Sequence, residues 1–184
     1  HTRFKCDWSS DVCSSDLLES ARLILDAFHA DDAPAMFFYA SQPEVAKWMA
    51  WNQHQTLEDS RRALDCLMWE LPGQYEWAIR LRDTGELVGG FSFLLKAEAT
   101  AELHFTLAPA YWRRGLTTEA GQTVLAWAWQ NHAKLRAIIT APAAENLGAL
   151  KVLERLSFYP GAKRRSGFHK FSGGIDVIEY HLAR

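Results

Sequence analysis

The sequence predicts an α+β domain of three layers, in which helices flank a mixed central sheet. Segments with the two-residue period of strands and the 3.6-residue period of helices follow one another. Their order is strand, helices, three-stranded meander, helix, strand, helix and two strands, which is typical of this architecture. The chain has 184 residues and no repeats or linkers, so we expect one domain over residues 18–184.

The first predicted elements are a strand and two short helices. Residues 21–28 read ARLILDAF, a short apolar run between polar residues, which predicts a strand. Asp31 or Asp32 can cap a helix that ends near residue 41. Pro43 is suited to the first position of a further helical turn.

A longer helix and a hairpin follow. Thr56 and Asp59 form an approximate capping box for a helix that we expect to reach Leu71. Residues 75–82 alternate in polarity, and residues 87–95 return after the turn sequence D-T-G-E.

Residues 100–107 form the third strand of the meander. Their alternation places Glu102, His104 and Thr106 on one face. Pro109 ends the strand. The remaining chain predicts elements at 117–132 (helix), 135–140 (strand), 146–156 (helix), 158–163 (strand) and 175–182 (strand).

Composition excludes several classes of protein. The chain is 48% hydrophobic and 23% charged, as soluble globular proteins are. A net charge of -2 argues against nucleic-acid binding, and no apolar run is long enough to span a membrane. The three cysteines show neither disulfide nor zinc spacing, which predicts a cytoplasmic protein without a metal site.

The first 17 residues differ in character from the rest. They are rich in Ser and Asp and have no period. Residues 7–17, DWSSDVCSSDL, resemble a translated sequencing adaptor, so we interpret 1–17 as a non-native or disordered segment. A natural polar tail is the alternative. Under the first interpretation, Cys66 is the one cysteine of the domain.

The segment 108–120, APAYWRRGLTTEA, is the sharpest chemical feature. A strand ends, a loop carries Arg113, Arg114 and Gly115, and a helix begins. Free amides and the dipole at a helix N-terminus favour an anion, and the two arginines add donors for phosphate oxygens. The alternative is an ordinary connection with a solvated arginine pair.

This loop resembles the acetyl-CoA loop of the GNAT superfamily, and in particular the Rim-type ribosomal-protein N-acetyltransferases, which often read Y-W-G-x-G-Y-A-T-E-A. The matching residues are Tyr111, Trp112, Gly115, Thr118, Glu119 and Ala120. Arg113 replaces a common glycine, and Thr117 stands at a position usually held by Gly or Ala. Segments 18–25, 83–89, 101–103 and 145–158 resemble other motifs of the same superfamily, in the same order.

The resemblance implies a GNAT fold with acetyl-CoA as co-substrate. The pantetheine arm would lie between strands 103–107 and 135–140 and pair with backbone near Thr106 and Leu107. Asn146 resembles a residue that contacts the arm or the acceptor; as an alternative or in addition, it is a helix N-cap. The pyrophosphate would lie on amides of Arg113, Arg114, Gly115, Leu116, Thr117 and Thr118.

The implied reaction is acetyl transfer to a primary amine by direct attack. Glu102 is the first candidate for the general base and His104 the second. Glu102 could instead be an exposed strand carboxylate, and His104 a partly buried ring. The family often places a tyrosine acid or a serine on the last helix, where this chain has Leu153 and Ala149.

The acceptor is a protein N-terminus or a small-molecule amine. Trp48, Trp51 and His54 lie where the family builds its acceptor groove, although core or rim positions would also explain them. The alternative function is a catalytically silent acyl-CoA-binding or regulatory module. We expect a monomer or a homodimer that binds neither membrane nor nucleic acid.

Overall fold

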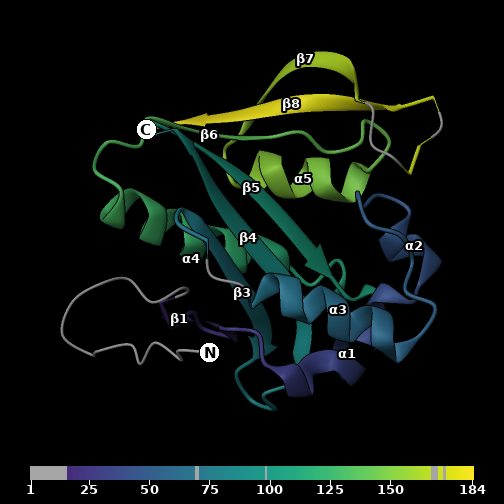
Figure 1. Ribbon diagram of the computed structural model, residues 1–184. Coiled ribbons are helices and arrows are strands. Elements are labelled where there is room, and N and C mark those ends of the chain that lie inside the picture. The colour runs from purple at the N-terminus through teal and green to yellow at the C-terminus, as the bar shows by residue number, and fades with distance from the viewer. Residues whose placement is uncertain (1–15, 69–70, 98, 167–169, 172) are drawn as a thin grey trace.

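The computed structural model describes residues 16–68, 71–97, 99–166, 170–171 and 173–184 (Figure 1). They form one eight-stranded sheet in the order β1-β2-β3-β4-β5-β6-β8-β7. β5 and β6 are parallel, and the other neighbouring pairs are antiparallel. The strands are β1 (Leu18–Glu19), β2 (Leu23–Asp26), β3 (Gln74–Leu81), β4 (Leu87–Ala97), β5 (Thr100–Leu107), β6 (Ala137–Thr140), β7 (Tyr159–Ser166) and β8 (Ile175–Ala183).

Helices lie on both sides of the sheet, so the predicted three-layer α+β class is confirmed (Figure 1). The longest helix, α4, follows the meander, and α5 follows β6. The helical elements are η1 (Ala30–Asp32), α1 (Ala33–Ala40), α2 (Pro43–Ala46), α3 (Leu57–Leu67), η2 (Pro109–Tyr111), α4 (Leu116–Asn131) and α5 (Leu147–Arg155).

The start of α3 is confirmed, but the expected end at Leu71 is wrong. The Thr56 side chain accepts a hydrogen bond from the Asp59 amide, and the Asp59 carboxylate accepts from the Thr56 amide. The helix ends at Leu67, and Met68 is its C-cap. The chain turns at Gly73, where φ is +80°, to begin β3. The helical spacing of apolar residues therefore continues in the sequence after the helix has ended.

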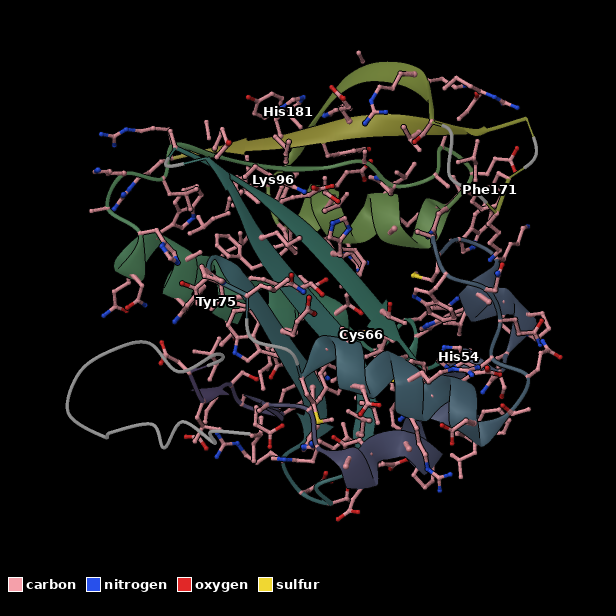
Figure 2. The ribbon with its side chains drawn as sticks, viewed as in Figure 1. His54, Cys66, Tyr75, Lys96, Phe171 and His181 are labelled. Atoms are coloured by element: carbon pink, nitrogen blue, oxygen red, sulfur yellow. The ribbon has the colours of Figure 1, made fainter. Side chains whose placement is uncertain are left out.

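The face of the sheet toward α4 carries an aromatic core. Trp127 of α4 lies 4.7 Å from Tyr75, 5.0 Å from Trp77 and 5.6 Å from Phe93, measured between ring centroids. Tyr75 is labelled on the α4 side in Figure 2. Asp16 also reaches this core, because its backbone oxygen accepts from Trp77 Nε1 at 2.9 Å and its carboxylate from Trp127 Nε1 at 2.7 Å.

The opposite face is covered by α1 and α3 along part of its length. Phe28, Met36 and Tyr39 pack there with Leu64 of α3 against Ala78 of β3. These side chains are buried. Beyond Ala78, the same face of the sheet carries polar side chains and borders a cavity.

A glycine fixes the spacing of β4 and β5 near that cavity. A Cβ atom at Gly89 would lie 2.2 Å from the backbone oxygen of Thr106 and 2.9 Å from the Cα of Leu107. Such contacts are too short for any side chain. Gly89 therefore allows the two strands to approach at the end of β5.

Candidate active site

A crevice opens where the two parallel strands separate. β5 pairs with β6 at Thr100, Ala101 and Glu102, opposite Ala137, Ile138 and Ile139. β5 then continues to Leu107, while β6 ends at Thr140. Figure 1 shows β5 continuing beside β4, whereas β6 runs with β8 and β7. Within the described residues, the β6-facing edge of β5 beyond Glu102 thus has no strand partner, as the predicted opening requires.

The predicted anion loop lies at the end of β5. Arg113 and Gly115 have φ values of +61° and +77°, so the backbone turns sharply into α4. Gly115 is the N-cap, and because it has no side chain, no side-chain hydrogen bond caps the first turn of the helix. The first intrahelical donor is the Glu119 amide, which bonds to Gly115 O at 3.0 Å, so the preceding amides of the first turn are free of the helical ladder.

These residues fit a diphosphate group. Amides from Leu116 to Thr118 point along the helix axis at its positive end, and Arg113 and Arg114 flank them. The Thr118 hydroxyl is buried and has no hydrogen-bond partner among the described residues. A ligand oxygen at this corner would supply partners that the protein does not.

A carboxylate in the first turn of α4 fastens the loop to β2. Glu119 Oε1 accepts from the Arg22 amide at 2.8 Å and from Ser20 Oγ at 2.7 Å. Arg22 Nε donates to Glu119 Oε2 at 2.7 Å, and Arg22 Nη1 donates to the backbone oxygen of Arg114 at 3.0 Å. This contact was not predicted from the sequence, although Arg22 and Glu119 both lie in motifs named there.

Asn146 caps α5, as one of its two interpretations predicts. Its Oδ1 accepts from the Ala149 amide at 3.2 Å. Asn146 and Ala149 also line the large cavity of the molecule, next to the end of β6. The capping role and a contact with a ligand are therefore compatible. Leu153 lines the same cavity and is fully buried, so an apolar side chain occupies the position of the family's tyrosine.

The cavity has a volume of about 740 Å³ and lies on the sheet face that α1 and α3 partly cover. It reaches from the α2 and α3 side to the β6 and α5 side. Leu107 and residues 113–118 are not part of its lining, so the anion loop lies outside it. The cavity brings together several predicted site residues: Trp48, Trp51, His54, Glu102, His104, Thr106 and Asn146.

His54 is held in place at one end of this cavity. Its Nδ1 lies 2.8 Å from Ser60 Oγ, and its ring lies 5.3 Å from that of Trp51. Burial lowers the pKa of His54, against the attraction of Asp59. Figure 2 shows His54 and Phe171 on the side of the molecule where α2 lies. His54 thus acts as part of an apolar wall.

Glu102 has two close partners on the cavity floor. Lys96 Nζ lies 2.6 Å from Glu102 Oε2, and His104 Nε2 lies 3.3 Å from Oε1. The hydrogen bond from His104, opposed by burial and aided by Lys96, lowers the pKa of Glu102 to about 2. A carboxylate with so low a pKa is a weak proton acceptor, but it can orient the imidazole of His104.

A second carboxylate, Glu76, was missed by the sequence analysis. Cross-strand register places Glu76 of β3 opposite Ser92 of β4, and Ser92 opposite His104 of β5. Ser92 donates a short hydrogen bond to Glu76 Oε2, and Gln74 Nε2 donates to Oε1 at 3.0 Å. Burial raises the pKa of Glu76 despite these bonds. The alternation of residues 75–82 already implied the face, but the hairpin register was needed to place Glu76 in this row.

The described residues contain neither a membrane-spanning helix nor a metal-binding cluster. No described helix has both the length and the apolar character that crossing a bilayer requires. No group of three or more His, Cys, Asp or Glu side chains in the described part of the chain is arranged to hold a metal ion.

Comparisons with known proteins agree with this geometry. A family model described as an acetyltransferase (GNAT) domain matches residues 22–159. The uncharacterized N-acetyltransferase YoaA of Bacillus subtilis is 28% identical over 172 residues, which cover 91% of this chain and 97% of YoaA. A GNAT-family acetyltransferase structure from Bacillus anthracis superposes with a TM-score of 0.82 at 23% identity and covers 91% of this chain and 98% of its own.

Structural neighbours include proteins that were solved with a cofactor. The RimL ribosomal-protein acetyltransferase in complex with coenzyme A superposes with a TM-score of 0.77 at 16% identity. The match covers 91% of this chain and 98% of RimL. At this identity the likeness supports the fold, and the ligand is a property of RimL.

Proposed function

The chain belongs to the acetyltransferase (GNAT) family, and from this premise we propose that it transfers an acetyl group from acetyl-CoA to a primary amine by direct attack. It is an acetyl-CoA-dependent acetyltransferase. One observation carries the proposal for its site: parallel strands separate beside a free helix N-terminus, next to a cavity with His104 on its floor.

The anion loop would hold the cofactor's diphosphate. Amides of Gly115, Leu116, Thr117 and Thr118 supply donors there, and Arg113 and Arg114 supply positive charge. The pantetheine arm would pair with the free edge of β5 near Thr106 and Leu107, and Asn146 lies on the other side of the crevice. Bound acetyl-CoA supplies an electrophilic thioester carbon.

His104 acts as general base, and Glu102 positions it. Because Glu102 faces Nε2, the other ring nitrogen is left to accept a proton from the attacking amine. The amine nitrogen forms a bond to the acetyl carbon, the carbon–sulfur bond breaks, and the electron pair leaves with the CoA thiolate. A backbone amide of β5 near Thr106 donates to the carbonyl oxygen as negative charge develops.

The cavity would receive the acceptor. Trp48 and Trp51 line it from the segment around α2, and α1 and α3 close its far side. A protein N-terminus and a small-molecule amine both satisfy the chemistry of direct attack. We also propose a cytoplasmic location, which the free thiol of Cys66 supports.

The test separates cofactor binding from turnover. We expect His104→Gln to lower kcat about 100-fold or more while the Kd for acetyl-CoA stays within twofold. Glu102→Gln should lower kcat less and change its pH profile, as a positioning residue would. Calorimetric titration with acetyl-CoA gives Kd, and release of CoA thiol with a panel of amines gives kcat.

The silent module is the competing function. The observations that favour it are Leu153 and Ala149, which stand where the family often has a tyrosine and a serine, and Thr117, which stands where it usually has Gly or Ala. Tight acetyl-CoA binding without thiol release from any amine would establish the module and refute the transferase. An unchanged kcat in His104→Gln would instead refute the assignment of the base.

A further inference from the structure

The cavity floor contains one carboxylate that the transfer step does not use. Resting on the proposed function, we infer that Glu76 binds the ammonium group of the acceptor, and that the acceptor is a small amine with an apolar body rather than a protein N-terminus. Three features support this role: the partners of Glu76, the cavity walls, and the contact of Lys170 with the α2 region beside the cavity.

Glu76 differs from the other acidic group of the floor in its partners. Glu102 is paired with Lys96 at 2.6 Å and with His104 at 3.3 Å. Glu76 accepts hydrogen bonds from the neutral groups Ser92 and Gln74 and forms no ion pair with a described residue, although His104, two strands away in the same row, attracts it at longer range. A mostly buried carboxylate without an ion pair of its own favours a cationic ligand, because an ammonium group would compensate its lost hydration.

The position of Glu76 suits an attacking amine. Glu76, Ser92 and His104 stand in one row across β3, β4 and β5 on the cavity side. His104 lies at the end of this row nearest the crevice, just past the last β5–β6 pair at Glu102. An ammonium bound at Glu76 is therefore next to the base that must remove its proton.

The walls facing this row are largely apolar. They come from α1, from the segment around α2, and from the residues before β8, where Figure 2 shows Phe171. The lining side chains that could cover the body of an acceptor are Phe28, Met36, Tyr39, Trp48, Trp51 and Phe171. Burying an alkyl or aryl group here is favourable, and the indole rings can also attract the ammonium.

A peptide would meet two obstacles in this cavity. Its backbone carries polar groups that need partners, and burying each without one costs about 1–3 kcal/mol. One end of the cavity is also held in place: Lys170, next to the lining residue Phe171, donates from Nζ to the backbone oxygens of Ala46 and, at 3.2 Å, of the lining residue Trp51. This contact joins the segment before β8 to the α2 region beside the cavity.

The experiment compares phenethylamine, ethanolamine and the tetrapeptide Ala-Ala-Ala-Gly by CoA thiol release at saturating acetyl-CoA. We expect kcat/KM for phenethylamine to exceed that for the other two at least tenfold. Glu76→Gln, which keeps the shape of the side chain, should lower kcat/KM for phenethylamine about 10- to 150-fold through KM, without changing the Kd for acetyl-CoA. Glu58→Gln, an exposed carboxylate on α3, is the matched control and should behave as wild type.

Calorimetric binding of phenethylamine to the CoA-saturated protein makes the result independent of turnover. A Kd for phenethylamine that rises tenfold or more in Glu76→Gln supports the inference, whether or not any amine releases thiol. If no amine releases thiol, the transferase function is refuted but the role of Glu76 in binding is not. Faster acetylation of the tetrapeptide than of phenethylamine would overturn the substrate class. Normal phenethylamine binding and turnover in Glu76→Gln would overturn the role of Glu76 and leave the transferase function intact.

Discussion

Replacing Gly115 with valine tests the anion loop most directly. Gly115 has a φ of +77° and forms the N-cap of α4. A Cβ atom there would meet Arg22 Nη2 at 3.6 Å, an ordinary contact, so the Cβ itself introduces no steric clash. Its effect comes from the backbone, because β-branched residues strongly disfavour positive φ.

The expected size follows from that conformational cost. The left-handed region costs a non-glycine residue about 1–2 kcal/mol. In the ligand-free Gly115→Val variant, the loop can relax to a conformation that avoids this cost. To present its amides to a diphosphate, it must return to the observed conformation, so the cost falls on binding. The Kd for acetyl-CoA should therefore rise about 5- to 30-fold.

Gly85 provides the matched control. It lies in the β3–β4 turn with a φ of +72°, and a Cβ atom there would have nothing within 4 Å. Gly85→Val should lose about 1–2 kcal/mol of folding stability if its turn cannot relax, with a fall in Tm of about 2–8 °C in thermal unfolding. Its Kd for acetyl-CoA, measured by calorimetric titration, should match wild type.

Two outcomes for these variants would contradict the proposed role of the anion loop in binding acetyl-CoA. If Gly115→Val and Gly85→Val both bind acetyl-CoA as tightly as wild type, the Arg113–Thr118 amides do not hold the cofactor. If both variants lose affinity equally, the loss reflects general destabilisation, and Gly115 has no special part in binding.

Three further predictions concern the supports of the site. Glu119→Gln removes the charge that fastens Arg22 and Ser20 to α4, so the Kd for acetyl-CoA should rise about 3- to 10-fold; calorimetry would contradict this with an unchanged Kd. Gly89→Ala should lose about 3 kcal/mol or more in denaturant unfolding, because its Cβ would meet the backbone of Thr106, whereas Gly148→Ala in α5 should be neutral or stabilising. Burial raises the pKa of Glu76, so ionising this group destabilises the fold as pH rises from about 4.5 through the raised pKa. The Tm of Glu76→Gln relative to wild type should accordingly increase between about pH 4 and pH 7.5, and a constant difference would contradict this sign.

Local patterns were sufficient to predict most of the fold. The capping box at Thr56, the alternation of β3 to β5 and the apolar period of α5 each depend on neighbouring residues, and the structure contains all of them. The end of α3 was missed because the period continues past Leu67, while the turn at Gly73 is set by the strand that follows.

The site was predictable where its residues are adjacent in sequence and not where they meet in space. The loop 113–118 is one continuous motif, so its form could be expected. Glu76 joins His104 through the register of three strands, and Glu119 meets Arg22 across 97 positions of sequence. The role of Glu102 also depended on a neighbour in space, since Lys96 lies on another strand.

The junction of β5 and β6 determines how the molecule can deform. Three residue pairs cross it, compared with eight between β4 and β5. Backbone pairing therefore holds β5 to β6 less firmly than it holds β5 to β4. A ligand that wedges between β5 and β6 would load these three pairs, whereas the longer pairing of β4 with β5 would keep its register.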